Sequence, residues 1–242
     1  MLAASHPCAC VEAAVAIKGF DCRRVELPDL LHRLPQRLRY GRPTVPGLML
    51  PSGEKVIGSV AILRRLEELI PESPLYPLDP EARARVEAAE EWGEAVLQDA
   101  ARRIEVALFR RRPSAFVSYT AASTLPIPRW LIRANAPVGV RLYGRLIGAS
   151  DAAARADMHA LPSHLEHVRE LIARETIGGQ APNAADLQIG ASVRQLGAIA
   201  DVGPLLAGHS AVALTRHFPP MVGYIPPGTA PGDWLAGFEA AT

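Results

Sequence analysis

The chain has 242 residues, of which 49% are hydrophobic and 21% charged, so it is long enough for one large globular domain or two small ones. This composition excludes a disordered or fibrous protein. Lysine and arginine total 26, against 25 for aspartate and glutamate. The net charge of +1 means that no overall field attracts nucleic acid or an anionic membrane, and binding to a polyanion would need a local patch.

The sequence predicts that the protein is located in the reducing cytoplasm. No stretch reaches the roughly 18 uninterrupted apolar residues of a membrane-spanning helix. The most apolar segment, 130–148, is interrupted by three arginines. There is no basic-then-apolar leader, and the three cysteines all lie within residues 8–22 instead of being spaced as a disulfide framework. We therefore expect a soluble cytoplasmic protein with neither a nucleic-acid nor a membrane partner.

The chain begins with helical and strand signals in alternation. A helix is predicted over residues 5–18, because its apolar positions follow a polar start, Pro7 lies near the first turn, and Gly19 stands where a left-handed C-cap would lie. Residues 22–27 have side chains typical of a strand.

A hairpin and a second helix are predicted next. Segments 44–50 and 55–58 favour strands, and Pro51-Ser52-Gly53 between them is typical of a turn. From residue 59, apolar residues recur at helical spacing up to a stiff, proline-rich linker at residues 71–78. The expected order is helix, strand, hairpin, helix.

The part after residue 78 has no convincing strand signal and is expected to be helical. Apolar stripes predict helices over residues 86–108, where the stripe includes Gly93 and Val96, and over 161–172. A further helix, 187–196, follows Asn183-Ala-Ala-Asp186, in which the N-cap side chain and the acid three residues later can bind each other's free backbone amides. Asn183 and Asp186 are therefore predicted to be structural caps.

Four regions give weaker signals. Residues 112–150, with four prolines and little periodicity, and the tail after Phe218 are expected to be irregular coverings. The basic run 110–112 has no interleaved aromatic residues and is predicted to be a solvated turn. The histidines at 159–167 do not form a metal-ligand motif, so no metal site is expected.

The start of the first helix is the first candidate site. Ser5 and Cys8 lie where backbone N–H groups are unpaired and the helix dipole is positive, so a thiolate there is stabilised and its pKa falls below roughly 8.5. That thiolate could belong to Cys8 or to a bound thiol. The alternative is that Ser5 only caps the helix and that Cys8 and Cys10 are small buried apolar residues. The Cys-Ala-Cys spacing fits neither a thioredoxin dithiol nor a complete zinc site.

Two further motifs could bind a ligand. The proline of Val45-Pro46 enters a predicted strand, and a cis bond there would expose backbone groups to a peptide-like ligand, whereas a trans bond would make an ordinary turn. Ser59, at the start of the second helix, offers a hydroxyl beside free amides, which suits a carboxylate or serves only as an N-cap.

Taken in order, these motifs resemble the glutathione transferase superfamily. The resemblance is carried by Ser-x-Pro-Cys-x-x-Val-Glu from Ser5, then Thr44-Val45-Pro46, Gly58-Ser59-Val60-Ala61-Ile62, the linker Pro74-Leu75-Tyr76-Pro77, and the capping box at Asn183. It implies a thioredoxin-like α/β domain over residues 1–77, followed by an α-helical domain over 78–242 with an irregular tail. Only Met1 to Ala4 precede Ser5, so either the first strand is a short remnant or the true start lies upstream.

The resemblance also implies a site for glutathione or a similar low-molecular-weight thiol, used as a co-substrate without another cofactor. Ser5, followed by Pro7, would donate a hydrogen bond to the bound thiolate. Val45 and Pro46 would present backbone to the cysteinyl unit, Ser59 would take the γ-glutamyl carboxylate, and Arg42, with other arginines of the same loop, would pair with the glycyl carboxylate. Gly58 departs from the family, which has an acidic residue or glutamine there as a partner for the ligand's ammonium group.

By this resemblance the protein is expected to be a homodimeric, glutathione transferase-like enzyme of detoxification that conjugates or reduces small electrophiles. Two alternatives remain open. One is thiol–disulfide exchange or deglutathionylation through Cys8. The other is a non-catalytic thiol- or ligand-binding protein that retains the fold.

Overall fold

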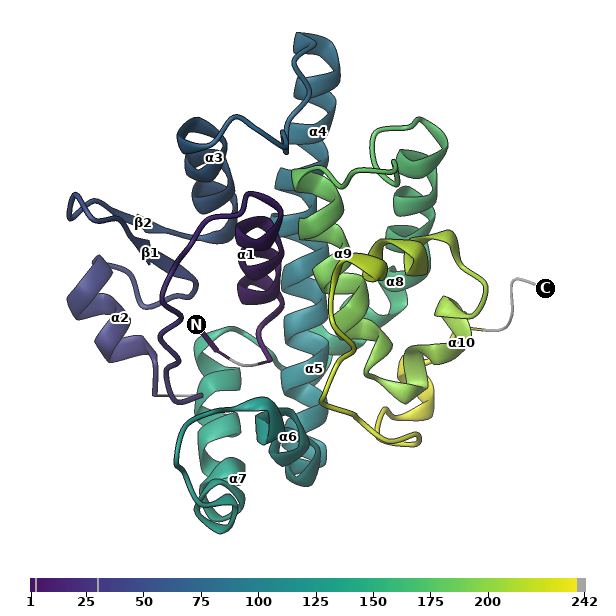
Figure 1. Cartoon of the computed structure of the whole chain (residues 1–242). Coiled ribbons are helices and arrows are strands. Elements are labelled where there is room, and N and C mark those ends of the chain that lie inside the picture. The colour runs from purple at the N-terminus through teal and green to yellow at the C-terminus, as the bar shows by residue number, and fades with distance from the viewer. Residues whose placement is uncertain (3, 30, 239–242) are drawn as a thin grey trace.

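The computed structural model describes residues 1–2, 4–29 and 31–238, and its first part contains two packed helices beside a hairpin (Figure 1). The buried Lys18, which follows the first helix, pairs with Glu67 and donates to the carbonyl oxygen of Ile70 at 2.7 Å, so it ties the two helices together. The elements are α1 (His6–Ile17), α2 (Arg33–Tyr40), β1 (Gly47–Met49), β2 (Lys55–Ile57) and α3 (Ser59–Leu69).

The predicted hairpin is present, but both of its strands are shorter than expected. β1 pairs with β2 in antiparallel register, with Gly47 opposite Ile57 and Met49 opposite Lys55. Gly53, with φ of 87°, provides the left-handed residue that the tight turn needs. The hairpin lies before α3 and leads the chain directly into the start of that helix (Figure 1).

The strand expected at residues 22–27 is absent from the described part of the chain. In its place, two backbone hydrogen bonds join this segment to Met1: the Met1 ammonium group donates to the carbonyl oxygen of Val25, and the N–H of Leu27 donates to the carbonyl oxygen of Met1, both at 2.9 Å. Met1 thus bonds to Val25 and Leu27, the two residues on either side of Glu26. This is the hydrogen-bond pattern of two parallel strands. Within the described residues this pairing is limited to Met1, and residues 22–27 form no strand.

The second part of the chain is helical, as expected. Its central helix, α9 (Ala184–Gly197), is buried on nearly every side and packs against both α1 and α4. A single cluster of buried apolar residues runs through both parts of the chain. The other long helical elements are α4 (Pro80–Trp92), a π-helical turn (Gly93–Gln98), α5 (Asp99–Arg111) and α8 (Asp151–Ala173).

The π-helical turn changes which residues of the predicted stripe face the core. One extra residue in the turn rotates the following side chains, so Leu97 is fully buried and the expected Val96 is only half-buried. The turn also brings the backbone close to α9. A Cβ atom on Gly93 would lie 2.9 Å from Cγ1 of Ile189, so glycine permits this contact.

Residues 112–150 are largely helical, and the expectation of an irregular covering was wrong. They form α6 (Pro113–Tyr119), a short 3-10 turn (Thr120–Ala122) and α7 (Arg129–Leu146). Two prolines of this segment, which were the reason for predicting a loop, lie at the starts of helices. Pro113 is the first residue of α6, and Pro128 directly precedes α7. The periodicity is weak because apolar residues occur on both faces of α7.

The C-terminal tail follows the expectation of a mostly irregular covering. Its described part contains one 3-10 turn (Gly232–Trp234), and Ile225 forms backbone hydrogen bonds with Ala198 and Ala200 at 2.8 and 3.0 Å. The segment between α9 and the tail forms α10 (Gly203–Leu206) and 3-10 turns at Ala200–Val202 and Ser210–His217. Trp234 is buried in the core. Within the described residues, no helix has the length and apolar character needed to cross a membrane.

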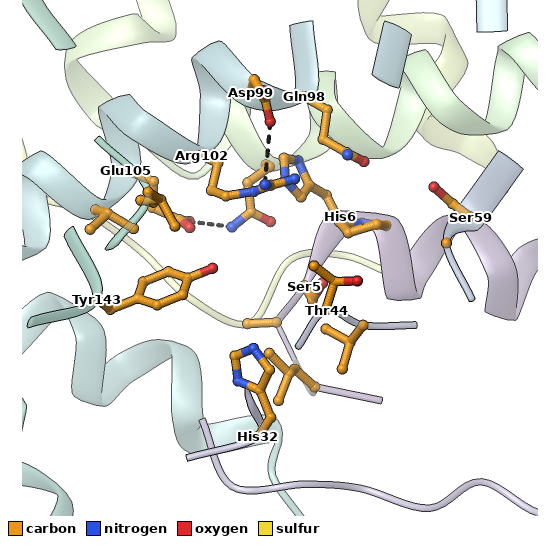
Figure 2. A pocket seen from close by; sticks show the side chains of 18 of the residues that line it. Ser5, His6, His32, Thr44, Ser59, Gln98, Asp99, Arg102, Glu105 and Tyr143 are labelled. Atoms are coloured by element: carbon orange, nitrogen blue, oxygen red, sulfur yellow. Dashed lines mark hydrogen bonds and ion pairs between the residues drawn. The ribbon is translucent and has the colours of Figure 1, made fainter. Parts of the chain in front are cut away.

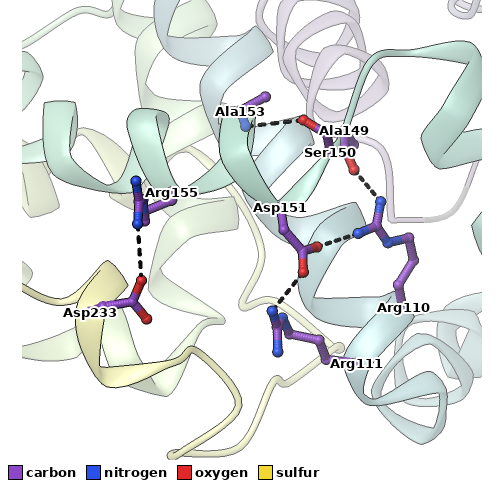
Figure 3. A network of polar contacts seen from close by, with 8 residues as sticks. All are labelled: Arg110, Arg111, Ala149, Ser150, Asp151, Ala153, Arg155 and Asp233. Carbon is purple, nitrogen blue, oxygen red and sulfur yellow. Dashed lines mark hydrogen bonds and ion pairs between the residues drawn. The ribbon is translucent and has the colours of Figure 1, made fainter.

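The basic run 110–112 has a structural role that the predicted solvated turn did not include. Arg110 and Arg111, at the end of α5, both pair with Asp151 in the first turn of α8 (Figure 3). Ser150 caps that helix by accepting a hydrogen bond from the N–H of Ala153 at 3.1 Å. These contacts fix the start of α8 against the end of α5.

Candidate functional site

A cavity of about 710 Å³ lies between the two parts of the chain. Its first wall is formed by the start of α1, the segment before β1 and the start of α3. Its second wall comes from α5 and α7, with the π-helical turn. Ser5, Pro7, Arg42, Val45 and Ser59 line this cavity, so residues chosen at three distant places in the sequence lie around one space.

Ser5 is the N-cap residue of α1 by position, with φ of −81° and ψ of 122°, but its side chain makes no capping hydrogen bond. Ser5 is half-buried and lines the cavity, where its side chain lies near those of His6 and Thr44 (Figure 2). Pro7, in the first turn, also lines the cavity.

Cys8 does not have the environment expected of a reactive thiolate. The residue is only 1% exposed and is not among the lining residues of the cavity. Its sulfur accepts a hydrogen bond from the N–H of Leu2 at 3.4 Å. Burial raises the pKa of the Cys8 thiol, and hydrogen bonding from Ser5 and Leu2 offsets only part of that rise. The expectation that the helix start would lower this pKa is therefore corrected, because desolvation of the thiolate outweighs the helix dipole.

Cys10 is a buried apolar residue, which is one of the interpretations that the sequence left open. Its Sγ donates to Oε1 of Gln188, at 3.3 Å, and burial holds the pKa of this thiol well above its ordinary value. No cluster of three possible metal ligands occurs among the residues that the structure describes.

The Val45–Pro46 peptide bond is cis. Val45 lines the cavity, and neither its N–H nor its C=O forms a hydrogen bond with another described residue. Pro46 is buried and is not a lining residue; its carbonyl oxygen accepts from the N–H of Gly58 at 3.0 Å. Arg42 is exposed at the same wall.

The start of α3 offers a concentrated set of donors. Ser59 is 1% exposed, and its hydroxyl oxygen has no hydrogen-bond partner among the described residues. The free first-turn amides of α3 lie beside it, and Gly58, Val60 and Ala61 line the cavity as well. Gly58 has φ of 98°, a conformation that side chains rarely adopt, so the position where the family has an acidic residue or glutamine is held by a backbone that requires glycine.

Two buried histidines line the cavity, and both are neutral at pH 7 (Figure 2). Burial, with a contribution from Arg102, holds the pKa of His6 well below its ordinary value. Burial, with contributions from Arg33 and the N-terminus, lowers the pKa of His32 to about 4. In each ring Nδ1 lacks a hydrogen-bond partner among the described residues.

Two carboxyl groups that line the cavity, Asp29 before α2 and Glu105 on α5, have altered acidity. Burial raises the pKa of Asp29 to about 6, with a further contribution from Glu26. Burial also raises the pKa of Glu105 to about 8, although Gln195 donates a hydrogen bond to its carboxyl group (Figure 2). Glu105 is therefore protonated at neutral pH, and it adds no charge to the cavity.

Sequence reasoning missed several residues that line the cavity. His32 comes from the N-cap of α2, Arg102 and Glu105 from α5, and Tyr143 from α7. Arg102, which pairs with Asp99 at 3.3 Å, lies on the charged side of a predicted helix, where nothing in the spacing distinguishes it from a solvated residue. Tyr143 lay in a segment for which no helix was predicted.

A comparison with protein families finds a match for the first part of the chain. Residues 2–74 match the family model for the N-terminal domain of glutathione S-transferase. No curated protein matches the chain by sequence.

Solved structures of low sequence identity share the whole architecture. A glutathione S-transferase from Sinorhizobium meliloti is 16% identical with a TM-score of 0.60, over 98% of this chain and 96% of that chain. One from Rhodospirillum rubrum is 20% identical with a TM-score of 0.56, over 89% and 82%. The beta-etherase LigF from Sphingobium sp. strain SYK-6 is 18% identical with a TM-score of 0.57, over 81% and 82%. These similarities show a shared fold: a thioredoxin-like N-terminal part and a helical second part.

Proposed function

Since residues 2–74 match the N-terminal domain of glutathione S-transferase and the whole chain shares that fold, we propose that its cavity binds glutathione or a similar low-molecular-weight thiol and activates the sulfur for attack on, or reduction of, a small electrophile. One observation carries the proposal. Ser5, Val45 and Ser59, which are far apart in the sequence, line one cavity. The Ser59 hydroxyl and the backbone groups of Val45 have no hydrogen-bond partner within the described chain, and the Ser5 hydroxyl makes no capping bond.

The free groups suit the parts of a γ-glutamyl thiol peptide. The N–H and C=O of Val45 would pair with the cysteinyl unit as an antiparallel strand does. Ser59 and the first-turn amides of α3 would take the γ-glutamyl carboxylate, because unpaired amides and the helix dipole favour an anion there. Arg42, exposed at the same wall, would pair with the glycyl carboxylate.

Glu94 would supply the carboxylate that position 58 lacks. It lies in the π-helical turn, lines the cavity, and is half-buried. An ammonium group bound near the start of α3 needs a negative partner, and Gly58 cannot provide one. A carboxylate from the helical part can satisfy the same charge from across the cavity.

Ser5 would act on the sulfur. Its hydroxyl would donate a hydrogen bond to the bound thiolate, which favours the ionised nucleophile at neutral pH. The thiolate would then attack the electrophilic carbon, and the leaving group would depart with the electrons of the broken bond. Cys8 has no part in this step, because its buried thiol does not reach the cavity.

The proposal also covers the compartment, the biological role and the oligomeric state of the protein. A reduced thiol co-substrate requires a reducing compartment such as the cytoplasm. Removal of electrophiles would make the protein a detoxification enzyme. We further propose a homodimer, which light scattering would test: a monomer mass at micromolar concentration in a fully active sample would contradict it.

Thermal-shift titration tests the binding step. The unfolding temperature is measured with glutathione, γ-glutamylcysteine, cysteine and S-methylglutathione, since a ligand that binds only the folded state stabilises it by RT ln(1 + [L]/Kd). We expect a shift with glutathione that Ser59→Ala reduces. Ser163→Ala, at a hydroxyl on α8 outside the cavity, should leave the shift unchanged.

Turnover is tested separately with an activated aryl chloride as electrophile. Binding without turnover of this or other electrophiles would favour the non-catalytic alternative, for which Gly58 is the supporting observation. Absence of a shift with every thiol at millimolar concentration would contradict the proposed function.

A further inference from the structure

The positive charge of this nearly neutral chain is concentrated in two segments. Residues 31–53 and 112–150 contain nine arginines and not one aspartate or glutamate, so the remainder of the chain is net acidic. The first segment forms α2 and the second forms α6 and α7. The rings of His32 and Tyr143 are 6.2 Å apart, which places the N-terminus of α2 beside the C-terminal half of α7. Both helices lie on the side of the molecule away from the C-terminal tail (Figure 1).

The solvent-facing side of α7 is apolar. Its packed side is formed by Ala136, Val140 and Gly144, which recur every four residues. On the opposite side, Val138 is 69% exposed and Leu142 is 57% exposed, and both share that side with Leu131. An amphipathic helix normally turns polar side chains to water, so a second apolar stripe indicates a second contact.

α2 has the same arrangement on a smaller scale. Its buried side consists of Gln36, with His32 at the N-cap. Leu34 and Leu38 lie on the opposite side and are 65% and 78% exposed, and Leu31 beside them is 71% exposed. Two neighbouring helices therefore direct leucine and valine side chains away from the core.

The arginines around these apolar residues are not neutralised. None of the eight arginines at positions 33, 37, 39, 42, 129, 133, 141 and 145 forms an ion pair with an acidic residue of the described chain. Arg110 and Arg111 behave differently, since both bind Asp151 (Figure 3). The charge of α2 and α7 is thus available to an anionic partner.

We propose that α2 and α7 form a docking surface for an anionic lipid bilayer. The α2–α7 surface consists of the exposed apolar residues Leu31, Leu34, Leu38, Trp130, Leu131, Val138, Leu142 and Leu146, together with the eight arginines named above. Helices that bind at a membrane interface combine arginines, which contact lipid phosphates, with leucine and tryptophan side chains, which enter the acyl boundary. The protein would lie on the bilayer without crossing it.

Two other occupants fit this surface less well. A second copy bound through the same surface would bring two sets of unpaired arginines together, which costs free energy. Single-stranded nucleic acid favours several aromatic side chains on which bases stack, and Trp130 is the one tryptophan of the α2–α7 surface. Exposed aliphatic side chains between arginines match a lipid interface more closely.

The α2–α7 surface lies next to the cavity, so docking on a bilayer would bring the cavity close to the lipid. His32, Arg33, Tyr143 and Ile147 come from α2, α7 and the residues beside them, and all four line the cavity. An apolar electrophile dissolved in the bilayer would therefore lie next to the wall of the cavity. This use rests on the proposed function, whereas docking itself does not.

Vesicle co-sedimentation tests the docking surface. The full chain is mixed with vesicles of phosphatidylcholine alone and with vesicles that also contain phosphatidylglycerol, at low and high salt. We expect binding to the anionic vesicles that weakens as salt screens the charges. The double variant Arg141→Glu/Arg145→Glu and the variant Leu142→Asp should each reduce the partition coefficient by at least about tenfold.

Matched control variants separate a local effect from a general one. Arg85→Glu changes an exposed arginine on α4, and Val212→Asp changes a valine that is 42% exposed in the 3-10 turn Ser210–His217. Both should bind vesicles as the wild type does, and circular dichroism should show that every variant is folded. The assay measures no thiol, so failure of the proposed function would leave this result unaffected.

Three results would overturn the proposal. The first is equal pelleting with both kinds of vesicle, or no pelleting with either. The second is wild-type binding by Leu142→Asp or by the double arginine variant. The third is tighter binding of the protein to a single-stranded oligonucleotide than to anionic vesicles, which would indicate a nucleic-acid surface. Dissociation of a dimer by Leu142→Asp, in a protein that binds no vesicles, would likewise indicate a surface between two copies.

Discussion

The ring of His32 lies edge-on to the ring of Tyr143, with 6.2 Å between the ring centroids and an angle of 70° between the planes. This contact joins the N-cap of α2 to α7, so it connects the two parts of the chain at the wall of the cavity. His32 is buried, and its imidazole is neutral there because burial disfavours the charged form.

Replacement of His32 by phenylalanine should reduce the acid sensitivity of the fold. The pKa of His32 is lowered to about 4 from its ordinary 6.5, so the folded state binds fewer protons than the unfolded state between these values. Its contribution to stability is present above pH 6.5 and is lost as pH falls toward 4. His32→Phe keeps a ring but cannot ionise. Urea unfolding at pH 7 and pH 5 should show that the variant loses about 1–3 kcal/mol less than the wild type.

The control for this measurement is Ser163→Ala, at an exposed serine on α8 that does not ionise. That variant should keep the pH dependence of the wild type. An identical loss of stability between pH 7 and pH 5 in the wild type and His32→Phe would show that His32 does not titrate as its burial indicates.

Glu105→Gln should stabilise the protein most at high pH. The pKa of Glu105 is raised to about 8, so its contribution to stability is fully present below about pH 4 and is lost as pH rises through 8. Glutamine remains neutral and can still accept the hydrogen bond that Gln195 donates. Melting temperatures at pH 5.5 and 8.5 should show an advantage of the variant that grows with pH. Glu166→Gln, at an exposed residue of α8, should show no such growth.

Asp186→Ala should cost more stability than loss of an ordinary helix cap. Asp186 is completely buried, and its carboxylate accepts from the N–H of Gly178 at 2.6 Å and from the N–H of Asn183 at 2.9 Å, while Asn183 accepts from the N–H of Asp186 at 3.0 Å. Alanine leaves two backbone donors unpaired in the interior, which costs about 2–4 kcal/mol in the free energy of unfolding. Urea midpoints measure this loss.

The exposed cap Asp79 provides the comparison. It accepts one hydrogen bond, from the N–H of Ala82 at 2.7 Å, at the start of α4. Asp79→Ala should cost about 1 kcal/mol, because water can replace the carboxylate there. Equal losses for the two variants would show that the buried capping box has no special role.

The sequence predicted correctly those parts of the fold that depend only on residues close together in the chain. The capping box at Asn183, the turn at Gly53 and the helix start at Ser59 each depend on a few neighbouring residues, and each is found where its sequence signal lies. The strand predicted at residues 22–27 depends on a partner elsewhere in the chain, and among the described residues the parallel pairing is limited to Met1. α7 was missed because its two apolar faces hide the helical period.

The candidate site divides in the same way. Its first wall consists of helix starts and a proline turn, whose free backbone groups can be foreseen from Ser5, Val45 and Ser59. Its second wall depends on which side chains of α5 and α7 the packing turns inward, and neither Arg102 nor Tyr143 has a local signal for that. The burial of Cys8 is likewise a tertiary property, so the sequence left the choice between Ser5 and Cys8 open.

Ser5→Ala and Cys8→Ala should separate activation of a bound thiol from reaction of the protein's own thiol. The Ser5 hydroxyl makes no capping bond and faces the cavity, whereas the Cys8 thiol is buried with a raised pKa. If Ser5 stabilises the bound thiolate, Ser5→Ala should raise the pH midpoint of glutathione ionisation in the complex by about one unit and leave glutathione affinity nearly intact. Ultraviolet absorbance of the thiolate measures that midpoint, and Cys8→Ala should not move it.

The same pair of residues makes an independent prediction in the absence of any ligand. In a Cys22→Ser background, which removes the exposed cysteine, the folded protein should react with iodoacetamide near pH 7 no faster than local opening of α1 allows, because the remaining thiols of Cys8 and Cys10 are buried and protonated. Rapid alkylation of Cys8 under these conditions would show a thiolate that burial should prevent. Together with a folded but inactive Cys8→Ala variant, it would transfer the reactive role from the bound thiol to Cys8, since a hydroxyl that only assists a ligand cannot account for either result.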